Sequence, residues 1–86
     1  MSDSIGNGLI IMLAHMKDED RTNELLARIG DGGVTTVEGA GAALELYCMG
    51  TDTTLEEAVD QLRDIKRDGP NELAWKWLQD NHPELF

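Results

Sequence analysis

The sequence is short of the residues that most catalytic and metal sites require. It has one cysteine, Cys48, and two histidines in 86 residues. No intramolecular disulfide can form, a reducing compartment is favoured, and no spacing of a zinc site is present. Cys48 lies in an apolar stretch, where cysteine is usually an inert small hydrophobe, and nothing nearby supports pairing with His15 or His82. We therefore predict a protein that is not an enzyme and holds no metal or cofactor, and keep an enzyme or small-ligand carrier built around Cys48 as the third hypothesis.

Basic residues are also scarce. The chain has 7 Lys and Arg against 17 Asp and Glu, a net charge of −10, and a pI near 4.3. Such a charge opposes direct binding to nucleic acid and docking on anionic membranes. It favours a basic protein partner through electrostatic steering, whereas solubility alone is the competing explanation.

Apolar runs are short. The run from Leu9 to Ala14 is too brief to span a bilayer, and no basic region precedes it as in a signal peptide. A cytoplasmic location, in a bacterial cell or an infected host, is the expectation.

Strand patterns are missing as well, because valine and threonine cluster only between Gly33 and Val37. The hydrophobic content of 41% is too high for a disordered chain, and the length suits one domain over residues 1–86. Helical spacing of apolar residues instead predicts an all-α fold, a small bundle of about five short helices.

The stretch Thr35–Gly50 is the predicted centre of this bundle. It carries only two charges, and small side chains fill its first half, so most of its sides can face another element. Thr35 and Glu38 match a capping box. Gly39 and Gly41 each cost roughly 1 kcal/mol against alanine in a helix, which indicates close packing against a neighbouring backbone.

Helical spacing places the other four helices. The first runs to about Lys17 and the second from an Asp18 cap to the glycines at 30–33. The fourth is capped by Thr53 with Glu56 or Thr54 with Glu57 and runs to about Arg67; the last begins at Pro70 and ends before Pro83. The expected buried face of the first helix is Ile5, Leu9, Met12, Leu13 and Met16, widened by Ile10, Ile11 and Ala14; that of the fourth is Leu55, Ala58, Val59, Leu62 and Ile65.

Acids on the predicted fourth helix form the main candidate site. Glu56, Asp60, Asp64 and Asp68 recur every four residues, with Glu57 beside them. Each step rises about 6 Å along a helix, close to the phosphate spacing of one nucleic-acid strand, roughly 6–7 Å. Such a ridge could imitate a phosphate backbone. The alternative is a solvated face on which Arg63, Lys66 and Arg67 neutralise the same acids.

The two tryptophans are predicted on nearly opposite sides of the last helix. Trp77 shares a face with Leu73 and belongs to the expected core. Trp75 falls among polar residues, where a partly exposed indole is a common interface anchor. Leu85 and Phe86 either cover Trp75 or extend an apolar patch around it.

Other motifs fail on chemistry. Asp18–Asp20 lacks the glycine and final glutamate of a calcium loop. The glycine groups at 30–33 and 39–41 follow no strand and carry no lysine, unlike phosphate-binding loops. The chain also lacks the helix-opening serine of an acyl carrier.

In size, charge and helicity the chain resembles the small acidic helical inhibitors of phages and plasmids. These include nucleic-acid mimics, antirestriction and anti-CRISPR proteins, and immunity proteins. The resemblance covers no motif and implies a non-enzymatic inhibitor that docks on a basic, nucleic-acid-binding surface of a partner protein. The predicted partner-binding residues are Glu56, Glu57, Asp60, Asp64, Asp68 and Trp75. The alternative function is an oligomeric assembly protein with a symmetric helical interface, which the broad apolar first helix would provide.

Overall fold

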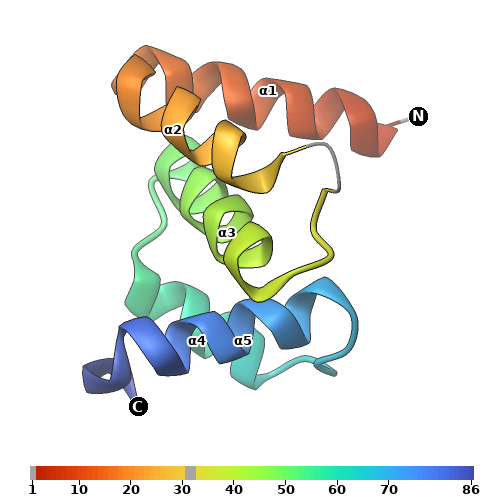
Figure 1. Cartoon of the computed structure of the whole chain (residues 1–86), viewed down its shortest axis with the longest axis vertical. Helices are drawn as coiled ribbons and strands as arrows, with labels where there is room; N and C mark the ends of the chain where they lie inside the picture. The colour runs from red at the N-terminus through yellow and green to blue at the C-terminus, as the bar shows by residue number, and fades with distance from the viewer. Residues whose placement is uncertain (1, 31–32) are drawn as a thin grey trace.

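A computed structural model describes residues 2–30 and 33–86, with side chains from residue 8 onward. It confirms the all-α prediction, and within these ranges no strand occurs. The helices are α1 (Ser2–Lys17), α2 (Glu19–Ile29), α3 (Val37–Thr51), α4 (Leu55–Arg63) and α5 (Pro70–Asn81), followed by a 3₁₀ turn, η1 (Pro83–Leu85). In Figure 1, α1 and α2 lie on one side of α3, and α4 and α5 lie on the other.

Helix α3 lies at the centre, as its small side chains predict. It contacts α1, α2, α4 and α5. Its residues belong to two separate apolar clusters, because Ala42 and Leu46 pack with Ala14 and Leu25, whereas Ala40 faces the α4–α5 side. The second cluster holds Ala40, Val59, Leu62, Ala74, Trp77 and Leu78. Burial of Trp77 confirms its assignment to the core.

Three glycines of α3 permit these close approaches. A Cβ at Gly41 would overlap the indole ring of Trp77, so here α3 packs against a side chain of α5. A Cβ at Gly50 would lie 2.5 Å from the backbone carbonyl oxygen of Ile10 in α1. Close backbone packing therefore occurs at Gly50, and at Gly39, where a Cβ would lie 3.0 Å from the Gly33 carbonyl oxygen.

Helix caps agree with the sequence in part. Asp18 caps α2 by accepting from the Arg21 amide at 3.0 Å. Thr54 and Glu57 form the complete capping box of α4. The predicted box of Thr35 with Glu38 is wrong, since Thr36 is the N-cap of α3 and accepts from the Gly39 amide at 3.0 Å. Of the expected glycine turn, Gly30 ends α2 at φ 67°, while Asp31 and Gly32 lie outside the described residues.

The predicted buried face of α1 is correct only in part. Leu9, Met12 and Met16 are 54%, 60% and 78% exposed, whereas Ala14 is fully buried and Leu13 partly so. The side chain of Ile5 lies outside the described part. Helix α1 presses Ala14 and the backbone of Ile10 toward α3, because small groups on both helices let the axes approach there. The larger apolar residues are left as an exposed stripe, which we call the α1 stripe (Leu9, Met12, Met16).

Candidate protein-binding surface

The acidic ridge predicted on the fourth helix is not a continuous helical row. Helix α4 ends at Arg63, so only Glu56, Glu57 and Asp60 lie on it. Asp64 is its C-cap and Asp68 lies in the connection to α5. Ile65, expected in the buried face, is 47% exposed. The prediction of a phosphate-like row with one helical repeat is therefore wrong, although all five acids are exposed.

Arg67 contacts the end of α4. Its Nη1 donates to the carbonyl oxygen of Leu62 at 3.0 Å, satisfying a backbone group that a longer helix would have bonded internally. The same guanidinium lies 4.2 Å from the centre of the Trp75 ring, a cation–π contact. Arg67 can make both contacts because the chain leaves the helical path before it.

Trp75 is half-buried and already has partners within the chain. Phe86 packs edge-on against its indole, with ring centres 4.9 Å apart, and Arg67 lies over the ring. Of the two roles predicted for Phe86, the geometry supports the one in which Phe86 covers Trp75. Trp75 is thus a poor candidate for a free anchor, and we do not retain it as one.

Most cations of the described residues are engaged by a few acids. Lys17 pairs with Asp52, Arg21 and Arg28 bridge Glu24 and Glu45, and Arg63 lies 3.5 Å from Asp60. Burial on its own lowers the pKa of Arg21, but the nearby Glu45 and Glu24 carboxylates raise it overall. The partly buried Glu45 thus ties α3 to α2.

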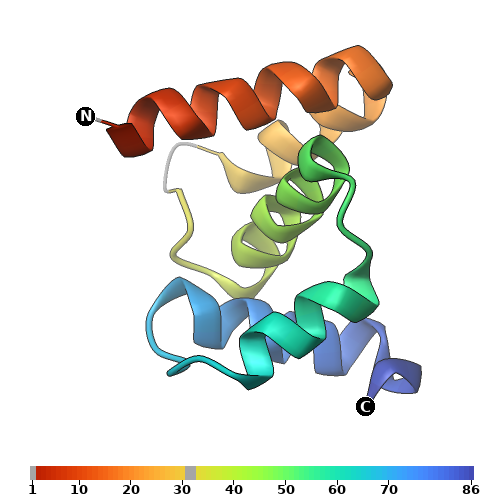
Figure 2. The same ribbon diagram turned by 180° about the vertical axis from the view of Figure 1, so that it is seen from behind.

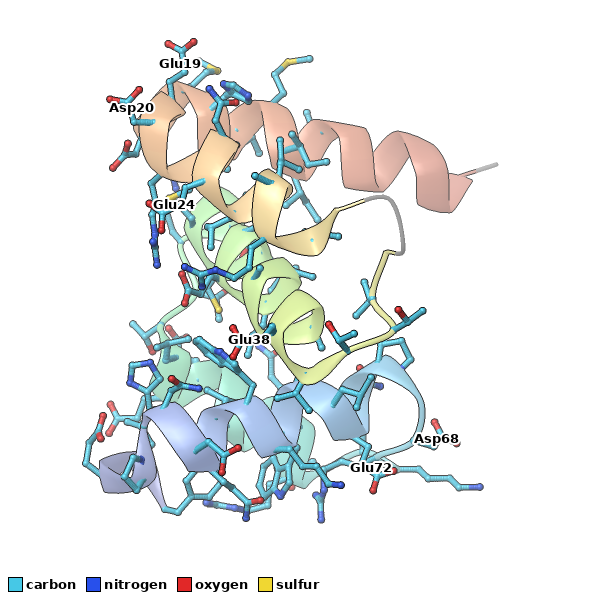
Figure 3. The ribbon with its side chains drawn as sticks, viewed as in Figure 1. Glu19, Asp20, Glu24, Glu38, Asp68 and Glu72 are labelled. Atoms are coloured by element: carbon cyan, nitrogen blue, oxygen red, sulfur yellow. The ribbon has the colours of Figure 1, made fainter. Side chains whose placement is uncertain are left out.

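The remaining described acids are exposed and pair with no described cation. They are Asp18, Glu19, Asp20, Glu38, Glu56, Glu57, Asp64, Asp68, Glu72 and Asp80. Figure 3 shows Glu19 and Asp20 projecting from the start of α2, and Asp68 and Glu72 near the start of α5, at the other end of the molecule. Negative charge is therefore displayed over both halves of the fold rather than on α4 alone.

An apolar groove lies between α3, α4 and α5, and the sequence analysis missed it. Its volume is about 660 Å³. The floor and walls are mostly small or aliphatic, and Asp64 is the one carboxylate among the lining residues: Val34, Ala40, Ala43, Leu44, Tyr47, Ala58, Gln61, Leu62, Asp64, Ile65, Pro70, Asn71 and Ala74. Figure 2, seen from the α4 side, shows α3 (green) above α4 (teal), with the segment leading into α3 (yellow) at the side.

One signal for the groove was present in the sequence. Ala40, Ala43, Leu44 and Tyr47 recur at the spacing of one helix face, so α3 offers an apolar stripe on the α4–α5 side. Three of the facing residues, Ala58, Ala74 and Pro70, are too small to fill the space that this stripe leaves. Spacing identifies the stripe, but only the packing shows that Ala40 is buried while Tyr47 stays exposed.

A smaller hollow holds the sole cysteine. Cys48 and His82 line it together with Arg21, Glu45 and Leu55. No hydrogen bond joins Cys48 to His82, whose Nδ1 lies 3.3 Å from a Glu84 carboxylate oxygen. Burial raises the pKa of the Cys48 thiol to about 11, and the negative charges of Glu45 and Glu57 act in the same direction. The thiol is therefore protonated at neutral pH, which disfavours a thiolate nucleophile.

This burial predicts slow thiol labelling. In the native protein an alkylating reagent is expected to label Cys48 far more slowly at pH 8 than in denaturant, because the native thiol is both covered and protonated. Labelling of the native protein at the denatured rate would contradict the buried placement.

The same thiol makes the free energy of unfolding depend on pH. The pKa of Cys48 is higher in the folded than in the unfolded protein, so the free energy of unfolding should decrease as pH rises from about 9 toward 11.

Residues 2–30 and 33–86 contain neither a metal-binding cluster nor a membrane-spanning helix. No group of His, Cys, Asp and Glu side chains there is arranged to hold a metal ion. No helix in those ranges has the length and apolar character needed to cross a bilayer. No family model, curated protein or solved structure matches this chain.

Proposed function

We propose that this protein is a small acidic, non-enzymatic inhibitor that docks on a basic, nucleic-acid-binding surface of a partner protein. One observation carries the proposal: exposed carboxylates without a described cation outnumber the paired ones. Exposed negative charge of this kind raises the rate of association with a positively charged surface. The rate enhancement decreases as the salt concentration rises. By covering such a surface, the protein would compete with nucleic acid for it.

Affinity capture from the cells that make the protein tests this function. Immobilised protein is expected to retain a basic protein at low salt, to release it as salt rises, and to lose it to added nucleic acid. A matched variant, with Asp64 and Asp68 changed to Asn, keeps the shapes of these side chains while removing two negative charges. It should retain less of the same partner. Capture that is indifferent to salt and to nucleic acid would refute the proposal.

Assembly with further copies of the chain is the second candidate function. The α1 stripe favours it, because three large apolar side chains on one helix face remain exposed. Against it stands the net charge of −10 on every copy, which makes close approach of two copies costly at low salt. The oligomeric state of the purified protein separates the two functions.

A further inference from the structure

We propose that the groove between α3, α4 and α5 binds one amphipathic helix of the partner, a helix with apolar side chains on one face and Lys or Arg beside them. This inference rests on the proposed function and names the part of the partner that is held. Three observations carry it: the shape of the groove, the chemistry of its lining, and the position of Asp64 with no basic residue in the lining.

The shape suits inserted side chains. A volume of about 660 Å³ falls within the range of ordinary binding pockets, roughly 300–1,000 Å³, yet is too small for a whole helix with its backbone. A partner helix would lie across the mouth and insert a few side chains. Most of the lining comes from helices, and no strand occurs in residues 2–30 and 33–86, so the described residues offer no strand edge for an extended peptide. Of the recurring recognition modes, helix-in-groove is the one that this lining suits.

The lining of the groove favours the binding of apolar side chains. Alanines from three helices, Ala43, Ala58 and Ala74, contribute a smooth floor, and exposed Tyr47 and Ile65 stand at the rim. Water on such a surface is favourably displaced by apolar side chains. The amide side chains of Gln61 and Asn71 remain available for hydrogen bonds at the edge.

The charge at the rim selects a basic helix. Asp64, the C-cap of α4, is the one carboxylate of the lining, and Gln61 lies about one turn before it. Asp64 has no described cation partner, and no lysine or arginine lines the groove. A Lys or Arg flanking the inserted face would meet Asp64. A second copy of the chain fits less well because it brings ten more negative charges.

The test uses a synthetic peptide of about five helical turns, with leucines along one face and lysines elsewhere. Amide chemical shifts of the labelled protein are expected to change at Ala43, Tyr47, Gln61 and Ile65. A peptide of the same composition with its leucines scattered around the helix should bind at least about tenfold more weakly, since its anchors cannot enter together. A peptide with glutamate in place of lysine should not bind measurably.

Paired tryptophan variants locate the site. Ala43→Trp fills the groove and is expected to lower peptide affinity at least about tenfold, whereas Ala27→Trp, on the exposed face of α2, should change it less than about twofold. Should Ala43→Trp fail to fold, Ile65→Ala at the rim replaces it and should weaken binding severalfold.

Several outcomes would overturn the groove assignment. They are shift changes confined to the α1 stripe or to Asp18–Asp20, equal binding of the glutamate peptide, and unchanged binding by the groove variant. Failure here is distinguishable from failure of the proposed function. If Ala43→Trp captures the natural partner as well as wild type, and salt still releases it, acidic docking stands and only the groove is excluded.

Discussion

Gly41→Ala is expected to lower the free energy of unfolding by about 2 kcal/mol or more, within the upper range for overpacking a core. The added methyl would overlap the five-membered ring of Trp77, which is buried and held between α3, α4 and α5. Alanine gains up to about 1 kcal/mol of helix propensity over glycine, too little to offset the overlap. Thermal unfolding should occur roughly 10 °C lower.

Gly8→Ala is the matched control. Nothing lies within 4 Å of a Cβ at Gly8 in α1, so the same substitution should be neutral or raise stability by up to about 1 kcal/mol. Thermal melts of the two variants and the wild type make the comparison. Equal stability of Gly41→Ala and wild type would mean that α3 and Trp77 do not meet as described.

Leu78→Ala is expected to cost about 2–5 kcal/mol, as for other fully buried leucines. Its side chain lies in the second apolar cluster, that of Ala40, Trp77 and Leu78, which also forms the back of the groove. Leu9→Ala is the matched control on the α1 stripe, where Leu9 is 54% exposed, and should change stability by no more than about 0.5 kcal/mol. Urea unfolding of both variants measures the difference.

Sedimentation of the same Leu9 variant decides between the two functions. The docking function predicts that wild type and Leu9→Ala both sediment as monomers at micromolar concentration. A wild-type oligomer that Leu9→Ala dissociates, together with a stability loss as large as that of Leu78→Ala, would instead place the α1 stripe in a self-association interface.

The fold class and most helix positions could be predicted because local signals agree there. Asp18 and the Thr54–Glu57 box mark helix starts, and Pro70 begins α5 as expected. The full buried face of α1 could not be predicted from the sequence. Residues 9–14 of that helix are all apolar, and periodicity alone does not choose which of them face α3. Contact with Gly50 of α3 decides the choice, and that contact is distant in sequence.

The candidate surface shows the same limit. Apolar spacing continues through Ile65 and so predicts a longer α4 than the one that ends at Arg63. Beyond that end, Arg67 bonds the Leu62 carbonyl oxygen and lies over Trp75 of α5, and spacing alone does not reveal such tertiary contacts. The regular acidic ridge disappears with those lost turns. The groove exists because no larger side chain of α4 or α5 covers Ala43 and Tyr47. The absence of such a neighbour leaves no pattern in the sequence.

The most direct test of acidic docking is the association rate of the purified pair, protein and captured partner, measured at several salt concentrations. Reversal of Asp60 and Asp64 to Lys removes two exposed carboxylates from the α4 side of the molecule. Wild type should associate quickly at low salt and slow steeply as salt rises, while the reversed variant should start slower and respond less to salt. Identical association rates and identical salt dependence for the wild type and the reversed variant would contradict acidic docking.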